Sequence, residues 1–223
     1  MKLSISSFFK KKDRWGPTKT GLVVFLTSCA AIFLLAFFQL YDFLSVSEPI
    51  QAEYLVVEGW VPDHVLKNAV DDFNKNNCKL IFCVGGPIET GSYLFQFNNF
   101  ADLTYYRLKK LGVIELKIVS IETDDVKKDR TYESALALKK WASTSGLELK
   151  SINVYTLGAH ARRSRFLFQK ALGDTVEVGI IGVVEQTFDP KAWWKYSNGF
   201  RTVIDETIAY LYAITYFNLF SCN

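Results

Sequence analysis

The chain has 223 residues, of which 49% are hydrophobic and 22% charged, so it can fold around a core and is too apolar for a disordered protein. Its formal charge of +3 arises in the N-terminal tail, because six of the 26 basic residues precede Gly21 beside one acidic residue. The remainder is slightly acidic, which excludes a basic surface for a nucleic-acid partner.

The first predicted element is a transmembrane helix over residues 21–44, preceded by a basic tail of residues 1–20. Residues 21–41 carry no charge, and about 20 such residues are enough for a helix to cross ~30 Å of hydrocarbon. Basic residues precede this run, whereas Asp42 and Glu48 follow it. The positive-inside rule therefore places the tail in the cytoplasm and everything beyond about Val46 outside it.

Two other fates of this helix stay open. One is cleavage as a signal peptide, and the other is lipoprotein maturation at Cys29, because "LTSC" fits a lipobox. The apolar run is longer than that of a usual signal peptide, and it continues behind Cys29, where a polar linker would be expected. We therefore favour the anchor, followed by a tether over residues 45–52 and an extracytoplasmic domain over residues 53–223.

The domain is predicted to alternate strands with helices. Short apolar, β-branched runs predict strands at residues 54–57, 80–84, 116–121, 152–156 and 176–184. Segments with helical periodicity predict helices at residues 65–74, 100–111, 131–145 and 161–172, and Gly112, Gly146 and Gly173 follow the last three as stop signals. This alternation predicts an α/β fold with a Rossmann-like, doubly wound, mostly parallel sheet.

The cysteines and histidines indicate no metal site and no disulfide scaffold. The chain has four cysteines, two histidines and no Cys-x-x-Cys pair. Cys78 and Cys83 could pair in an oxidising compartment, but the position of Cys83 in the middle of a predicted strand favours a small buried side chain.

The candidate site lies in the loops that follow the strands, because ligands bind at the carboxyl ends of the strands in such sheets. These loops are residues 58–63 ("EGWVPD"), 85–91 ("GGPIETG"), 122–134 and 157–163 ("LGAHARR"). The candidate acids and bases are Glu58, Glu133 and His160. The candidate ligand-binding residues are Gly59, Gly85, Gly86, Pro87, Arg130, Thr131, Gly158, His160 and Arg163.

The arginines of "HARRSR" suggest an anionic ligand. They fall in the first turns of a helix, where the macrodipole already supplies about half a positive charge. His160 and Arg163 are three residues apart and share a helical face, and His160 is expected to be neutral there and suited to general-base work. Backbone amides at the Gly85 turn and the Arg163 guanidinium would contact the anion.

Each of these features also has an ordinary structural explanation. Gly85 and Gly86 could simply form a tight turn, and Asp129 or Thr131 could cap the helix that follows. Asp124 and Asp125 could belong to a solvated loop.

These motifs resemble those of the SanA/YdcF/ElyC family of bacterial envelope-associated proteins over roughly residues 53–217, and the anchor matches its membrane-anchored subgroup. The family's glycine pair falls on Gly85 and Gly86, and its His-x-x-Arg segment falls on His160 and Arg163. Its Asn-Thr-x-Glu-Asn helix start falls on residues 130–134, with Arg130 and Ser134 in place of the asparagines. Residues 58–60 ("EGW") replace a more usual glycine-rich turn.

The resemblance implies a Rossmann-like periplasmic domain, single-pass anchorage in the bacterial inner (plasma) membrane, and a role in envelope integrity through lipid-carrier or peptidoglycan-precursor metabolism. It implies no settled reaction, and the sequence identifies no cofactor.

Three functions stay open. The first is an envelope-biogenesis or envelope-integrity factor that binds a phosphorylated or anionic small molecule, a lipid-linked precursor or an envelope protein partner. The second is a phosphoester hydrolase or transferase, and the third, a nucleotide or S-adenosylmethionine binder, rests on fold analogy alone. The aromatic residues between Trp193 and Phe217 suit contact with a partner or the membrane surface, or ordinary packing on the sheet.

Overall fold

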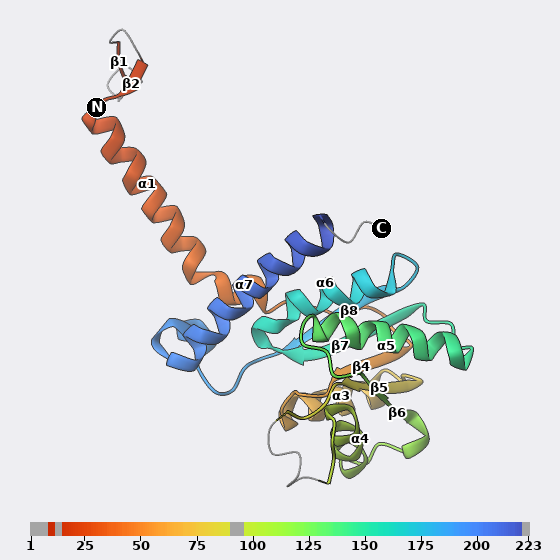
Figure 1. Cartoon of the computed structure of the whole chain (residues 1–223). Helices are drawn as coiled ribbons and strands as arrows, with labels where there is room; N and C mark the ends of the chain where they lie inside the picture. The colour runs from red at the N-terminus through yellow and green to blue at the C-terminus, as the bar shows by residue number, and fades with distance from the viewer. Residues whose placement is uncertain (1–8, 12–14, 90–95, 220–223) are drawn as a thin grey trace. The chain divides into compact units, whose positions relative to one another are not determined.

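The computed structural model describes residues 9–11, 15–89 and 96–219, which fall into two units, Met1–Leu40 and Tyr41–Asn223 (Figure 1). In the first unit, β1 (Phe9–Lys11) pairs antiparallel with β2 (Trp15–Pro17). The other residues of the predicted tail up to Arg14 lie outside the described part of the chain.

The apolar helix α1 spans Lys19–Phe38 and is long and apolar enough to cross a membrane. Its first turn is capped by Thr18, whose side-chain oxygen accepts a hydrogen bond from the Gly21 N–H at 3.0 Å. The predicted helix of residues 21–44 is divided in the structure, since a separate short helix, α2 (Leu40–Leu44), follows. Tyr41 and Leu44 are buried in the second unit, so their packing, which hydropathy does not reveal, sets the end of the apolar helix.

The second unit is built on a six-stranded sheet with the order β3-β8-β7-β4-β5-β6. Its parallel strands are β4 (Tyr54–Glu58), β5 (Leu80–Gly85), β6 (Ile118–Glu122), β7 (Ser151–Leu157) and β8 (Glu177–Val183). The edge strand β3 (Ser47–Glu48) pairs antiparallel with β8. The predicted mostly parallel sheet is confirmed.

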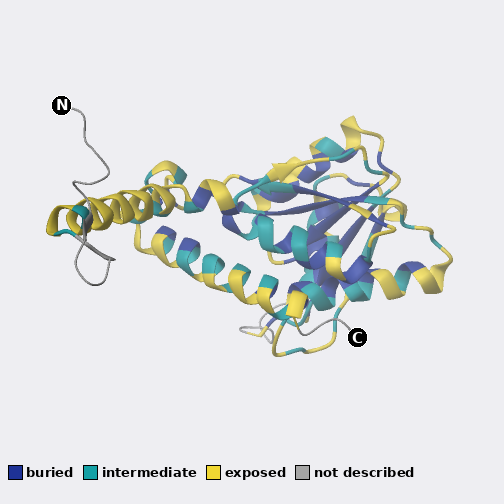
Figure 2. Cartoon of the chain, turned by 90° about the horizontal axis from the view of Figure 1, so that it is seen from above, coloured by how far each residue is buried: buried dark blue, intermediate teal, exposed yellow. Residues whose placement is uncertain are grey.

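Helices cover both faces of this sheet, as a doubly wound fold requires. Val56 and Phe82 belong to the core beneath α5 (Arg130–Ser145) and α6 (Ala161–Leu172). Val57 and Cys83 belong to the opposite core, beneath α3 (Asp63–Lys75) and α4 (Phe100–Lys110). All five residues of β4 are therefore buried, which explains why its sequence is continuously apolar up to Glu58. Figure 2 shows the strands of the sheet in the deeply buried centre of this unit.

The segment of residues 45–52, predicted to be a tether, contributes to the sheet edge. Besides forming β3, it is held by Asn153, whose side-chain amide accepts from the Ile50 N–H at 3.0 Å and donates to the Ile50 carbonyl at 2.8 Å. Gly179 is required beside this contact, since a Cβ there would lie 2.0 Å from the Asn153 amide oxygen. Asn153 is 103 positions from Ile50, so these two hydrogen bonds to the backbone of residue 50 could not be predicted from the local sequence.

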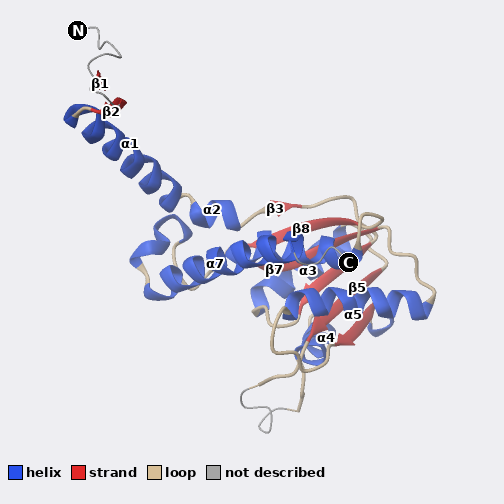
Figure 3. Cartoon of the chain, turned by 45° about the horizontal axis from the view of Figure 1, so that its top comes forward, coloured by secondary structure: helices blue, strands red, loops and turns tan. Residues whose placement is uncertain are grey.

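The long C-terminal helix α7 (Ser197–Leu219) was not predicted (Figure 3). It follows a 3-10 segment, η5 (Pro190–Lys195), and packs Ala213 and Phe217 against Leu167 of α6. Its later half carries no charged residue on any side, so it lacks the strong contrast between faces by which an amphipathic helix is recognised. Elsewhere the predicted elements are confirmed, although residues 116 and 117 belong to a 3-10 turn, η3 (Glu115–Lys117), and not to β6.

Candidate functional site

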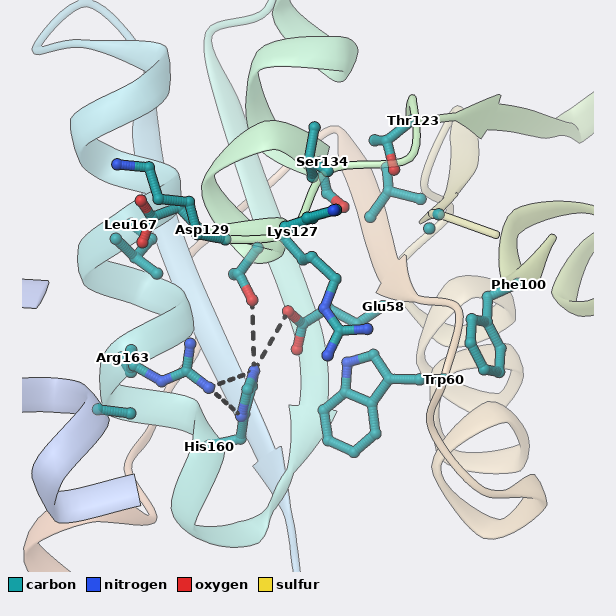
Figure 4. A pocket seen from close by; sticks show the side chains of 18 of the residues that line it. Glu58, Trp60, Phe100, Thr123, Lys127, Asp129, Ser134, His160, Arg163 and Leu167 are labelled. Carbon is teal, nitrogen blue, oxygen red and sulfur yellow. Dashed lines mark hydrogen bonds and ion pairs between the residues drawn. The ribbon is translucent and has the colours of Figure 1, made fainter. Parts of the chain in front are cut away.

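A pocket of about 710 Å³ lies at the carboxyl edge of the sheet (Figure 4). The chain order of the parallel strands reverses between β4 and β7, and a crevice forms at such a switch point because the connections leave in opposite directions. Glu58 ends β4, and His160 follows β7 through the short turn η4 (Gly158–His160). The topology of the sheet therefore brings these two side chains together from positions far apart in the sequence.

Glu58 is a buried carboxylate, only 3% exposed. The Thr156 hydroxyl donates to one of its oxygens, and the Ser164 hydroxyl lies 3.1 Å from both. Burial opposes ionisation, but the charge and hydrogen bonding of His160, the Thr156 hydroxyl and the charge of Arg163 outweigh it and lower the pKa of Glu58. Glu58 is therefore a fixed negative charge at neutral pH.

His160 lies between two carboxylates. Its Nδ1 is 2.7 Å from Oε1 of Glu206, and its Nε2 is 3.7 Å from Oε1 of Glu58 and 3.5 Å from the Thr131 hydroxyl. Burial disfavours the imidazolium, but the two carboxylates outweigh burial and raise the pKa of His160 to about 9. The expectation of a neutral general base is thus wrong for this structure, because the expectation considered only the helix N-terminus.

Arg163 makes a bidentate ion pair with Glu206 of α7. Its Nε lies 2.8 Å from Oε2 and its Nη2 lies 2.9 Å from Oε1. Burial opposes ionisation of Glu206, yet the bonds and charges of His160 and Arg163 lower its pKa to about 2. Arg163 Nη2 also lies 3.0 Å from His160 Nδ1, so two cations converge on one carboxylate.

The other two arginines of "HARRSR" also have partners within the protein. Arg162 donates to the Phe43 carbonyl and lies 4.1 Å from the centroid of the Phe43 ring. Arg165 pairs with Glu48 of β3. The cations that suggested an anionic ligand are thus answered by protein groups, and Glu58, His160, Glu206 and Arg163 form a network without net charge.

Eight of the predicted site residues line the pocket. These are Glu58, Gly85, Gly86, Pro87, Arg130, Thr131, His160 and Arg163. Arg130 donates to Glu89 at 2.9 Å at the exposed rim. Gly85 also has a packing role, because a Cβ there would lie 2.8 Å from the Cβ of Phe100.

Gly59, Gly158 and Glu133 do not line this pocket among the described residues. A Cβ on Gly59 would lie 2.5 Å from the Phe100 carbonyl oxygen, so this glycine allows α4 to approach β4. Gly158 has a φ of +44°. Glu133 lines a separate hollow with Lys140 and Trp141, so it does not join the Glu58–His160 network.

Two residues of the candidate site, Glu206 and Trp60, were not among the predicted site residues. The Trp60 ring packs edge-on against the His160 ring, with centroids 4.9 Å apart, and lines the pocket. Trp60 lies directly after Glu58–Gly59, so its loop position was the available signal. Only a weak signal in the sequence marked Glu206, which is the last charged residue before the uncharged end of α7.

The start of α5 faces the pocket without a side-chain cap. Its N-cap residue, Asp129, has a left-handed backbone with φ of +56° and makes no side-chain capping bond, so neither Asp129 nor Thr131 has the predicted capping role. Arg130 and Thr131 line the pocket just after it. The positive end of the α5 dipole is therefore directed at the cavity.

The described residues contain no group of three histidine, cysteine, aspartate or glutamate side chains placed to hold a metal ion. Cys29, Cys78 and Cys83 are free thiols, and Cys83 is fully buried as predicted. Cys222 and residues 90 and 91 of the glycine loop lie outside the described part of the chain.

No family model matches the chain, and no curated protein matches it. Its class is therefore given by fold and site: a Rossmann-like α/β domain with a buried carboxylate–imidazolium–carboxylate–guanidinium network at the switch point of its sheet.

Proposed function

We propose that the protein is a membrane-anchored envelope-biogenesis or envelope-integrity factor whose pocket binds a phosphorylated or otherwise anionic ligand. The observation that carries this proposal is the state of His160. Its Nδ1 is engaged by Glu206 at 2.7 Å, whereas its Nε2 has only looser neighbours, the Thr131 hydroxyl and Arg163 Nη2 at 3.5 Å and Glu58 Oε1 at 3.7 Å. The imidazolium thus offers a charged donor at the pocket, and Thr131 beside it belongs to the uncapped first turn of α5.

The two parts of this proposed anion-binding site, the His160 imidazolium and the N-terminus of α5, support each other. A helix N-terminus and a charged donor both stabilise an anion, and a charge-assisted hydrogen bond is about twice as strong as a neutral one. Glu58 lies deeper than His160 and keeps the imidazolium protonated, while Glu206 fixes the orientation of the ring. Glu58 and Glu206 are positioning residues in this proposal, and His160 is the contact residue.

The anchor and the envelope belong to the same proposal. Residues of α1 would cross a bacterial inner membrane with the basic tail inside, and the pocket would then lie in the periplasm. The resemblance to the SanA/YdcF/ElyC family supports an envelope role and suggests a cell-wall precursor or lipid carrier as the source of the ligand.

A second candidate, phosphoester hydrolysis or transfer, is favoured by the same imidazolium. With a pKa of about 9, His160 suits the role of a general acid that donates its Nε2 proton to the leaving oxygen. Turnover of a panel of lipid-linked and sugar phosphates by the full chain would distinguish this function from binding alone.

Replacing His160 by glutamine is expected to weaken the binding of inorganic phosphate and of a short-chain prenyl phosphate by about tenfold or more, because a charged donor is lost. Calorimetric titration of the detergent-solubilised full chain at pH 7 measures the affinity. The matched control is Arg165→Gln, which removes a cation outside the pocket from α6, the helix that follows His160. Equal affinity in wild type and His160→Gln would refute the anion site.

A reporter fused after Asn223 is expected to be active outside the cytoplasm. The basic residues before Gly21 would hold the N-terminus inside, and α1, which is long and apolar enough to cross a bilayer, would cross it once. Paired fusions to alkaline phosphatase and to a fluorescent protein that folds only in the cytoplasm measure this topology. Cytoplasmic activity would contradict the proposed compartment.

A further inference from the structure

The outer face of α7 is an exposed apolar surface. We define it by Ile208, Leu211, Tyr212 and Leu219, of which Ile208 is 62%, Leu211 53% and Leu219 68% exposed. The helix carries no charged residue between positions 207 and 219, and its opposite side packs Ala213 and Phe217 on the domain. Packing on the domain therefore accounts for the inner side of this apolar segment and leaves the outer face unexplained.

Chain connectivity keeps the part of α7 around Tyr210 close to the end of α1. The helix α1 ends at Phe38, and Phe43, five residues later, makes an edge contact with Tyr210 of α7 at a centroid distance of 5.9 Å. Five residues of extended chain span at most ~18 Å, and the residues of α2 span less. If α1 spans a bilayer, Phe43 is thus within about that distance of the membrane boundary, and the part of α7 around Tyr210 lies one ring contact further, whatever the orientation of the domain.

Two pairs of basic and aromatic side chains lie beside α7. Next to Tyr212, the Lys128 ammonium lies 5.0 Å from the centroid of the Tyr216 ring, and Tyr216 stacks on Tyr212. Next to Tyr210, the Arg162 guanidinium lies over the half-exposed Phe43 ring. Aromatic rings beside basic groups are typical of side chains that meet anionic headgroups while an apolar face enters the acyl boundary.

From these observations we propose that the outer face of α7 docks on the surface of the bilayer that α1 spans. This inference rests on the proposed anchorage and adds a second contact with the membrane. Tyr212 also lines the pocket, so docking places the pocket beside the lipid headgroups. An anionic ligand attached to a lipid would then reach His160 without leaving the membrane.

The test measures collisions of a nitroxide label with oxygen, which concentrates in lipid, and with a nickel chelate, which stays in water. The full chain with Cys29→Ser and Cys222→Ser is placed in phosphatidylcholine–phosphatidylglycerol vesicles, while Cys78 and Cys83 are buried and escape labelling. Labels are attached at Leu211→Cys and, as a second site on the same face, at Ile208→Cys. Leu116→Cys, at a position that is 89% exposed in η3, is the water control, and Leu34→Cys in α1 is the lipid control.

The oxygen-to-nickel collision ratio at positions 208 and 211 is expected to exceed that at position 116 by about fivefold, as for a helix at the acyl boundary. A ratio equal to that at position 116, with a lipid-like ratio at position 34, would overturn the docking and leave the anchorage intact. Low collision rates with both reagents would show that protein covers α7, which also overturns it. A water-like ratio at position 34 would overturn the proposed anchorage itself.

Discussion

Glu206→Ala is expected to lower the free energy of unfolding by about 3 kcal/mol, because it leaves two partly buried cations without their shared carboxylate. His160 Nδ1 and the Arg163 guanidinium both bond to Glu206 and lie 3.0 Å from each other. Once the carboxylate is removed, these like charges repel each other in a site from which most water is excluded. The loss measures this stranded charge and does not measure the net contribution of the network.

Asp205→Ala is the matched control, because it removes the neighbouring carboxylate, which lies on the exposed side of α7. Its effect is expected to stay within about 0.5 kcal/mol. Denaturant titrations of both variants in the same detergent, monitored by tryptophan fluorescence, give the comparison. If Glu206→Ala and Asp205→Ala lower the free energy of unfolding by the same amount, the interactions of Glu206 with Arg163 and His160 make no particular contribution to stability.

Arg163→Ala tests whether Arg163 stabilises the fold through its ion pair with Glu206 or serves only to contact an anionic ligand. Because Glu206 would keep His160 as a partner, the loss is expected to be smaller than for Glu206→Ala, about 1–2 kcal/mol. The double variant should be more stable than the sum of the single losses predicts, since it strands one cation and not two. An arginine that served only an anionic ligand would instead leave the free energy of unfolding of the ligand-free protein unchanged.

The sheet could be predicted because its strands are buried on both faces. A parallel strand covered by helices on each side is a nearly continuous apolar run, as in "YLVV" of β4, and such a run is visible without knowledge of its neighbours. Three helix ends were equally visible, since Gly112, Gly146 and Gly173 have φ between +70° and +92° and few other residues adopt such angles.

The composition of the site could be predicted only in part. Glu58, His160 and Arg163 could be selected because they lie in or just after loops at the carboxyl ends of the parallel strands, and the strand topology fixes where these loops meet. The charge of His160 could not be predicted, since it depends on Glu58 and on Glu206, which are 102 and 46 positions away in the sequence. Glu133 was wrongly grouped with them because a residue at the start of α5 can face either side of the helix.

The neutral network limits the affinity expected for an anion. An incoming phosphate would gain the His160 Nε2 donor and the α5 dipole, but it would not find an unpaired guanidinium, because Arg163 is already bound to Glu206. Glu58 would also oppose its approach. We therefore expect a ligand with further contacts to the pocket, such as the Trp60 ring, to bind more tightly than inorganic phosphate.

The stability of the protein is expected to fall by about 3 kcal/mol as the pH rises from 6.5 to about 9, the pKa of folded His160. The folded imidazole holds its proton more tightly than the unfolded one, so its contribution is complete below pH 6.5 and is lost as the pH rises through about 9. Glu206 acts in the opposite direction, since its contribution is present above its unfolded pKa and is lost as the pH falls through about 2.

Denaturant titrations at intervals between pH 6 and pH 9 measure this slope. His160→Gln should abolish this slope. Because His160 is also the proposed anion donor, phosphate affinity should fall over the same interval as stability does. A flat stability profile in the wild type would show that His160 is not held protonated between Glu58 and Glu206, and the anion site would then lose its charged donor.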